Sequence, residues 1–183
     1  LSAWYPMLAV FDEDGWNLDM PSDIGDSVFA DMANFDVRVD APADLVIAST
    51  SVVQNKQITG DRQILQVSSG PAREFALVMS PDFIVNSRQT GGVTINSFFL
   101  PGSAEGGQAT LKTSVEAIET YSELFGPYPY SELDVVGAPM RYASGVEFPG
   151  IIIIASENYS KPDNLGFTIT TAHQPNIFTG PLY

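Results

Sequence analysis

Short runs in which apolar and polar side chains alternate dominate the first hundred residues of this chain. In the clearest of them, Phe35-Asp36-Val37-Arg38-Val39-Asp40, the apolar side chains would face a core and the charged ones would face water. Similar runs follow at Leu45–Ala48, Ile64–Val67, Phe75–Met79, Phe83–Val85 and Val93–Leu100. Turn residues such as Ser69-Gly70-Pro71 separate the runs. The pattern predicts an antiparallel β-sandwich or saddle over residues 1–101.

A different period begins after residue 101. The segment Pro101–Gly107 is small and flexible, which is typical of a linker. A helix is expected beyond it, with a capping box at Thr113 and Glu116 and a stop at Gly126-Pro127. Its apolar face would consist of Leu111, Val115, Ile118, Tyr121 and Phe125.

Two further strands are expected after this helix. Leu133–Val136 is one, and the unbroken apolar run Ile151–Ile154 indicates a second strand that is buried on both faces. A helix followed by such strands is typical of α/β packing. We therefore predict a mainly β chain with a smaller α/β part, divided into residues 1–101 and 102–183.

The charge of the chain excludes one class of partner. Its 22 acidic and 8 basic residues give a formal net charge of −14, which would repel a phosphate backbone, so we expect no nucleic-acid partner. No stretch approaches the roughly 20 apolar residues of a membrane-spanning helix, so this segment is expected to be soluble. The compartment stays open, because a signal or anchor upstream of Leu1 would not be visible.

Few residues offer familiar catalytic chemistry. The sequence has no phosphate-binding loop, no dinucleotide fingerprint and no Gly-x-Ser-x-Gly elbow. Asp12-Glu13-Asp14-Gly15 resembles part of a calcium loop, but it lacks the closing glutamate and is interpreted as a solvated turn. His173 is the only histidine, so the chain cannot form a metal site from several histidines.

Glu147 is the more informative candidate. It lies in Gly145-Val146-Glu147-Phe148-Pro149-Gly150, directly before the isoleucine run. Glycine permits close approach of a ligand backbone, and a carboxylate at a sheet edge can pair with an ammonium group. From these residues alone, an exposed strand glutamate without a binding role remains the alternative.

Three segments taken in order carry a resemblance. Phe125-Gly126-Pro127-Tyr128-Pro129-Tyr130, Leu133-Asp134-Val135-Val136 and Gly145–Gly150 together resemble the entry into the catalytic domain of the membrane alanyl aminopeptidase family of zinc peptidases. Trp4-Tyr5-Pro6 and Ser80-Pro81-Asp82-Phe83 are similar to parts of the family's N-terminal β domain. The resemblance extends to about Ile154. It implies the end of that β domain followed by the first helix and strands of a thermolysin-like catalytic domain.

The resemblance also implies roles for individual residues. Glu147 would bind the free α-amine of a peptide, and the strand backbone at Gly145 and Val146 would align that peptide. The family has Met where this chain has Val146. Zinc would be the cofactor of the parent enzyme, with His173 a remnant of its His-Glu-x-x-His motif.

A second departure from the family bears on activity. Gln174-Pro175 follows His173, so the general base and the second histidine are missing, and proline would disrupt the metal-binding helix. We therefore expect this chain to be an inactive fragment of an aminopeptidase without zinc of its own. The alternative is a non-catalytic module that binds peptides or proteins on the same scaffold.

Overall fold

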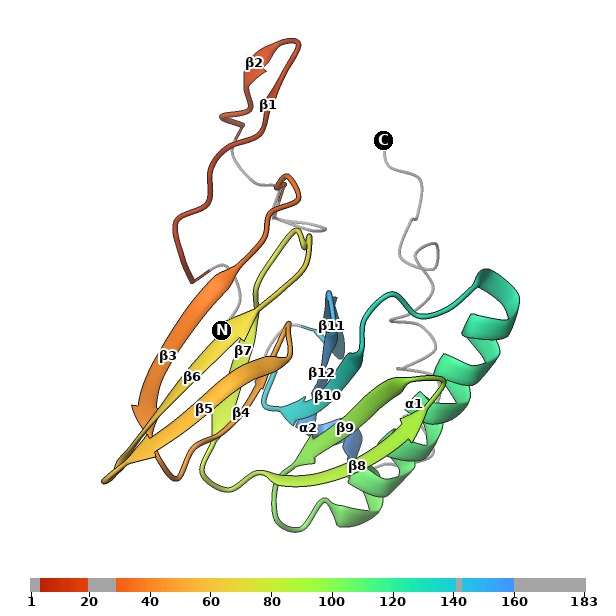
Figure 1. The fold of residues 1–183 in the computed structure, drawn as a ribbon. Helices are drawn as coiled ribbons and strands as arrows, with labels where there is room; N and C mark the ends of the chain where they lie inside the picture. The colour runs from red at the N-terminus through yellow and green to blue at the C-terminus, as the bar shows by residue number, and fades with distance from the viewer. Residues whose placement is uncertain (1–3, 20–28, 141–142, 160–183) are drawn as a thin grey trace.

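The computed structural model describes residues 4–19, 29–140 and 143–159. The described chain is mainly β and has two helices (Figure 1). Four β-sheets form within it, and three of them are entirely antiparallel. The prediction of a mainly β chain is therefore confirmed.

The N-terminal half contains a pair of facing antiparallel sheets. The first has the strand order β3-β6-β5 and the second is β4-β7. Their bounds are Asp36–Pro42 for β3, Val46–Ser49 for β4, Val53–Thr59 for β5, Arg62–Ser68 for β6 and Leu77–Ser80 for β7. Leu65 and Val67 of β6 pack against Leu77 and Phe75 in a shared core. Antiparallel sheets of this kind agree with the alternating runs of the sequence.

A five-stranded mixed sheet forms the next layer. Its order is β11-β12-β10-β9-β8, in which β9, β10 and β12 are parallel and the two edge strands are antiparallel to their neighbours. The bounds are Ile84–Thr90 for β8, Val93–Phe99 for β9, Glu132–Ala138 for β10, Gly145–Phe148 for β11 and Ile151–Ala155 for β12. All five residues of β12 are buried, as its unbroken apolar run predicts.

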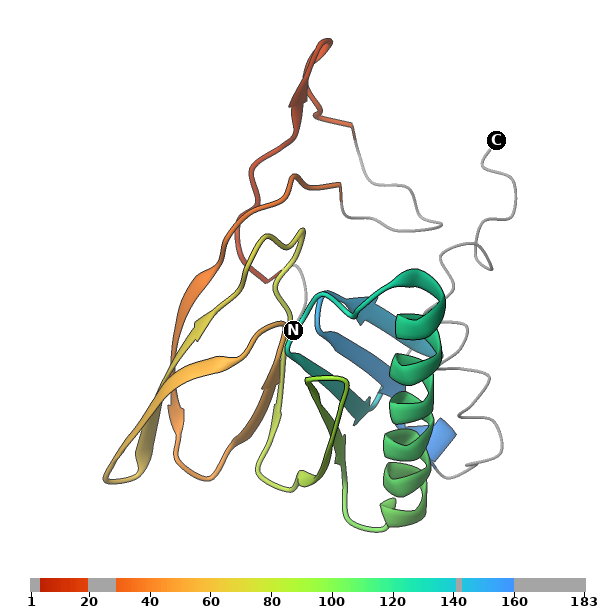
Figure 2. The same ribbon diagram turned by 45° about the vertical axis from the view of Figure 1, so that its right-hand side comes forward.

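The two faces of this sheet pack against different layers. Ile151 and Ile153 face β4 and β7, where they share a cluster with Ala48. Ile152 and Ile154 face the opposite way, in a cluster with residues of helices α1 (Ala104–Phe125) and α2 (Ser156–Tyr159). Figure 2 shows the resulting succession of three-stranded sheet, two-stranded sheet, five-stranded sheet and α1.

The predicted boundary at residue 101 does not separate two sheets. Strands β8 and β9, which precede it, belong to the same sheet as β10, β11 and β12, which follow it. The reason is that β9 buries both of its faces, with Ile95 and Phe99 toward α1 and Phe98 toward the two-stranded sheet. A strand of this kind needs a central position. The change of sheet instead falls between β7 and β8.

The predicted start of α1 is wrong. The helix begins at Ala104 with Ser103 as its N-cap, so Thr113 and Glu116 lie inside it and form no capping box. Gly106 and Gly107, interpreted as linker, are helical and buried because their missing side chains allow close packing. A Cβ on Gly106 would lie 2.2 Å from the carbonyl oxygen of Tyr159, and one on Gly107 would lie 2.2 Å from the Phe99 ring.

The predicted end of α1 is confirmed, but its predicted apolar face is only partly so. The helix stops at Phe125, and Gly126 caps it with a φ of 99°, a conformation that favours glycine. Val115 and Ile118 are buried against the sheet. Phe125, however, is 82% exposed, so the predicted apolar face does not extend to the last turn.

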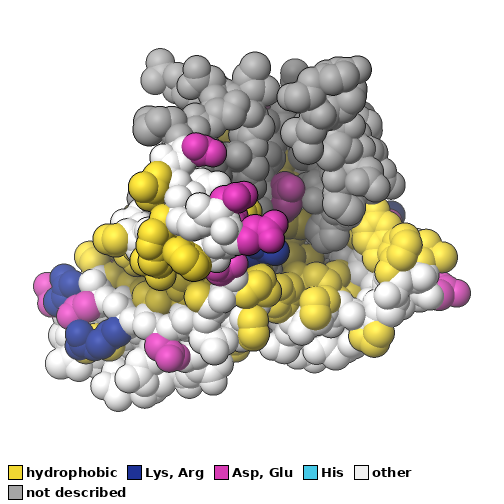
Figure 3. Space-filling model, turned by 90° about the horizontal axis from the view of Figure 1, so that it is seen from above, with side chains coloured by type: hydrophobic (Ala, Val, Ile, Leu, Met, Phe, Trp, Pro, Cys, Tyr) yellow, Lys and Arg dark blue, Asp and Glu magenta, His cyan; other side chains and the backbone are white. Residues whose placement is uncertain are grey.

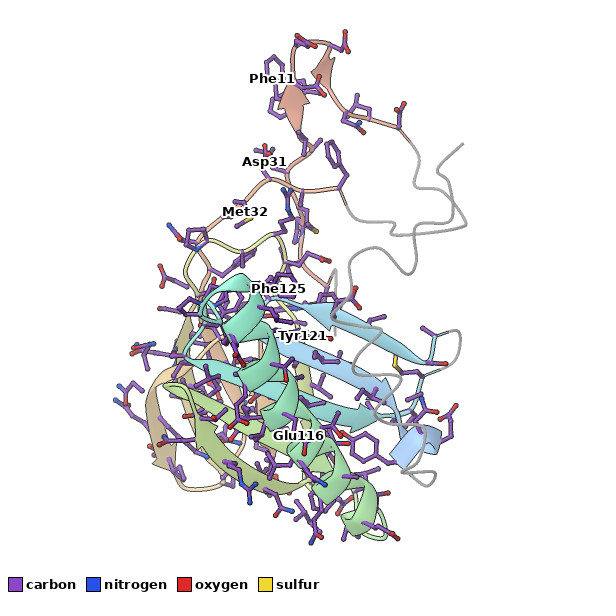
Figure 4. The ribbon with its side chains drawn as sticks, turned by 90° about the vertical axis from the view of Figure 1, so that its right-hand side faces the viewer. Phe11, Asp31, Met32, Glu116, Tyr121 and Phe125 are labelled. Atoms are coloured by element: carbon purple, nitrogen blue, oxygen red, sulfur yellow. The ribbon has the colours of Figure 1, made fainter. Side chains whose placement is uncertain are left out.

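Exposed hydrophobic side chains gather at one end of the molecule. The rings of Phe11 and Trp16 meet edge to face on the hairpin of β1 (Phe11–Asp12) and β2 (Gly15–Trp16), and both remain largely exposed. Figure 4 places Phe11 and Met32 on the N-terminal segment and Phe125 at the end of α1. Figure 3 shows yellow hydrophobic surface on this end, with acidic side chains between. The side chains of Phe11, Trp16, Met32 and Phe125 therefore add little to the core.

The acidic turn of this hairpin has the structure expected of it. The Asp14 N–H donates to Oδ1 of Asp12 over 3.0 Å, and Gly15 has a φ of 106°. The turn is thus closed by its own side chain, and the interpretation of Asp12–Gly15 as a solvated turn is confirmed.

Candidate functional site

The three substrate-binding residues predicted from the sequence lie on β11, at one edge of the five-stranded sheet. Val146 is partly buried and packs toward the two-stranded sheet. Glu147 is exposed and pairs with Ile152, whose side chain faces the helices. Because paired residues point to the same side of a sheet, Glu147 lies on the helix face.

Strand β11 lies at one edge of the five-stranded sheet, and its pairing with β12 sets the direction of its backbone groups. The Ala155 N–H donates to the Ser144 carbonyl over 3.0 Å, so these two residues form a hydrogen-bonded pair. Hydrogen-bonded and non-bonded pairs alternate along an antiparallel ladder. The N–H and C=O groups of Gly145 and Glu147 therefore point away from β12, and β11 is the last strand on this side of the sheet among the described residues. An extended peptide could add to this edge as a further strand.

A two-residue turn fixes the position of β11. Pro149 and Gly150 join it to β12, and the φ of Gly150 is 74°. Proline followed by a glycine with positive φ is the combination that a type II turn requires. Space is also restricted, since a Cβ on Gly150 would lie 2.8 Å from the carbonyl oxygen of Thr50. The turn thus holds the edge strand against the two-stranded sheet.

The remaining predicted residue is His173, which lies outside the described residues. Within the described ranges, no group of three His, Cys, Asp or Glu side chains is placed to hold a metal ion. The described part of the chain therefore does not fit the ligand set of zinc hydrolysis.

A buried acidic network lies on the opposite face of the sheet, and sequence reasoning assigned it no role. Asp134 of β10 is only 3% exposed. Its Oδ1 accepts a hydrogen bond from the Asn96 side-chain amide over 2.9 Å, and its Oδ2 accepts one from the Ser49 backbone N–H over 3.2 Å. Ser87 in turn donates to Oδ1 of Asn96 over 2.6 Å. The network joins β4 to β8, β9 and β10.

Burial raises the pKa values of two carboxyl groups in this region. Desolvation raises the pKa of Asp134 to about 7, and the neighbouring Glu132 carboxylate adds to the increase, while the bonds from Asn96 and Ser49 oppose it. Burial also raises the pKa of Glu132, again opposed by a hydrogen bond from Asn96. Neither carboxylate takes part in the salt bridges found among the described residues, which join Arg62 to Asp40 and Lys112 to Glu116.

Glu132 lines a cavity of about 440 Å³. The cavity lies where the end of β4, the β6–β7 loop, the start of β10 and the β11–β12 turn meet, and Ser49–Ser51, Ser68–Ser69 and Tyr130 contribute to its walls. A concave site with a half-buried carboxylate of raised pKa meets the usual physical criteria for a binding site.

The sequence itself marks Glu132 and Asp134 as unusual. Glu132 and Asp134 alternate with Leu133 and Val135 in a strand that is otherwise apolar, and a charged side chain at such a position needs partners. The partners themselves come from distant segments that no local pattern connects.

Comparisons with known proteins add no relative: no protein-family model matches the chain, and no curated protein matches its sequence. Of the helices described, neither combines the length and the apolar composition that crossing a membrane requires.

Proposed function

We propose that the chain is a segment of a zinc aminopeptidase of the membrane alanyl aminopeptidase family, spanning the end of the β domain and the start of the catalytic domain. The observation that carries the proposal is the position of Glu147, exposed on β11 at the edge of a mixed sheet. The sequence motifs quoted above supply the family, and the geometry of β11 is compatible with the role that they imply.

In this proposal the edge strand binds the first residues of a peptide. The outward N–H and C=O groups of Gly145 and Glu147 pair with the peptide backbone, which fixes its direction and register. The Glu147 carboxylate accepts hydrogen bonds from the terminal ammonium group, and a charge-assisted bond of this kind is stronger than a neutral one. Val146 packs on the other face and keeps the strand in place.

Zinc would supply an activated water in the parent enzyme. The described residues offer no set of ligands for it, so in the proposal their part in the reaction is to hold the substrate. In the proposal the ligands and the general base come from sequence outside these 183 residues.

A non-catalytic peptide-binding module is the second candidate. The same edge position of β11 favours it, because strand addition there needs no metal. The full-length natural protein separates the two candidates. Bound zinc and release of N-terminal residues from peptides support the aminopeptidase, whereas peptide binding without zinc or hydrolysis supports the module.

Substitution of Glu147 by Gln tests the amine-binding role in the full-length natural protein. The side chain keeps its shape but loses its charge, so kcat/KM for alanine 4-nitroanilide should fall about 30-fold, equivalent to about 2 kcal/mol. Thermal unfolding should be nearly unchanged, since Glu147 is exposed. Glu123→Gln, on the exposed side of α1, is the matched control and should retain full efficiency. Equal efficiency of Glu147→Gln and the wild type would refute the role.

A further inference from the structure

The cavity beside Glu132 has an unusual charge distribution. Among the described residues that line it, Glu132 alone is charged, and neither lysine nor arginine is present. Asp134 lies two residues further along β10 and adds a second buried negative charge when ionised. A half-buried carboxylate with no internal cation is costly, and a bound cation would offset that cost.

The walls of the cavity are held in place by hydrogen bonds within the protein. Ser49 Oγ donates to the Ser51 carbonyl over 2.7 Å, and Ser51 Oγ donates to the Ser68 carbonyl. Thr50 Oγ1 accepts from the Ala76 N–H over 2.8 Å, and Ser69 Oγ accepts from the Phe35 N–H over 3.2 Å. These bonds link the β4–β5 and β6–β7 connections. The cavity is thus preformed, which lowers the entropic cost of binding a ligand.

We propose that this cavity binds a small organic cation, with its ammonium group held by the Glu132 carboxylate and its apolar part against Tyr130. Tyr130 supplies an aromatic wall, against which the apolar part of such a ligand can pack. The volume lies within the range of about 300–1,000 Å³ that is usual for small-molecule sites. The inference is independent of the proposed aminopeptidase function, because Glu132 and Glu147 lie on opposite faces of the sheet.

An organic cation fits these walls better than a metal ion does. Calcium requires six to eight oxygen ligands. Both oxygens of Asp134 already accept hydrogen bonds, and Glu132 is the one carboxylate among the described residues that line the cavity. Glu132 would be left as the main ligand. An ammonium group needs only a few acceptors and tolerates an aromatic neighbour.

The experiment is a calorimetric titration of the chain with benzylamine, compared with the uncharged benzyl alcohol. Benzylamine should bind with a millimolar dissociation constant and benzyl alcohol at least tenfold more weakly, a difference of about 1.4 kcal/mol. Glu132→Gln should weaken benzylamine binding about tenfold. Glu123→Gln removes an equal charge from α1 and should leave binding unchanged. Amide chemical shifts should change at Ser49–Ser51 and Ser68–Ser69.

Several results would overturn the proposal. Equal binding of benzylamine and benzyl alcohol, equal binding by Glu132→Gln and the wild type, or calcium binding without benzylamine binding would each do so. If Glu132→Gln does not fold, Tyr130→Leu provides a second test, in which benzylamine binding should weaken several-fold while thermal unfolding stays cooperative. Failure of this experiment leaves the Glu147 proposal untouched, because the two use different residues and ligands.

Discussion

Replacing Gly106 with alanine should lower the free energy of unfolding by about 3 kcal/mol. The new Cβ would lie 2.2 Å from the carbonyl oxygen of Tyr159, and backbone atoms cannot move aside as a flexible side chain can. Alanine favours a helix over glycine by about 1 kcal/mol, so the steric cost has to exceed that gain. Urea denaturation followed by circular dichroism measures the difference.

Gly70→Ala is the control for this substitution. Nothing lies within 4 Å of a Cβ at Gly70, so this variant should be neutral or slightly more stable, because alanine restricts the unfolded chain. If Gly106→Ala were as stable as Gly70→Ala, the close contact between α1 and α2 would be wrong.

The second large effect concerns Asp134 and pH. With a pKa of about 7 in the folded protein against an ordinary value of 3.8, Asp134 keeps its proton on folding over this interval while the unfolded chain loses it. Its contribution to stability is therefore fully present below pH 3.8 and is lost as the pH rises to about 7. The loss amounts to about 4 kcal/mol, because each pKa unit corresponds to about 1.4 kcal/mol.

Asp134→Asn isolates this effect, because asparagine has a similar shape and does not titrate. The free energy of unfolding of the variant relative to the wild type should rise across the pH interval and then level off. Asp44→Asn, at an exposed position, serves as the control and should show no such rise. A constant difference between Asp134→Asn and the wild type from acid to neutral pH would exclude the raised pKa.

The strands that the sequence predicted best are those whose burial leaves a pattern. Asp36–Pro42 alternates along its length, and Ile151–Ala155 is apolar throughout because both of its faces are covered. In these strands the pattern of apolar residues follows directly from which faces are buried. The position of Glu147 on an edge strand was also predictable from the sequence, through the Gly145–Gly150 motif.

Strand β5 could not be found in this way. All of Val53–Thr59 is exposed, so no hydrophobic pattern marks it as a strand. It forms because the turn at Gly60, with a φ of 62°, returns the chain along β6, where backbone pairing holds it. The prediction that Gly106 and Gly107 belong to a linker was wrong for a different reason. Small residues suggest flexibility in a sequence, whereas here they allow two helices and a strand to come close together.

The partners of Asp134 in the acidic network could not be predicted from the sequence either. The strand context of Glu132 and Asp134 was visible, but Asn96 lies 38 residues before Asp134 and Ser49 lies 85 residues before it. Only the pairing of β9 with β10, and the packing of β4 above them, brings these groups together. A cavity that opens between such segments has no counterpart in a one-dimensional pattern.

The parallel pairing of β9 with β10 has a consequence for how the chain reaches this state. These strands can meet only after the 22 residues of α1 have crossed over the sheet, and the Ser49–Asp134 bond closes a still longer loop. Pairings between distant segments slow folding, because the entropy of loop closure is lost before the contacts form. We therefore expect the β5–β6 and β8–β9 hairpins to form early. Docking of the two-stranded sheet onto Asp134 would be a late event, and until then the nascent chain would expose the apolar face of β12.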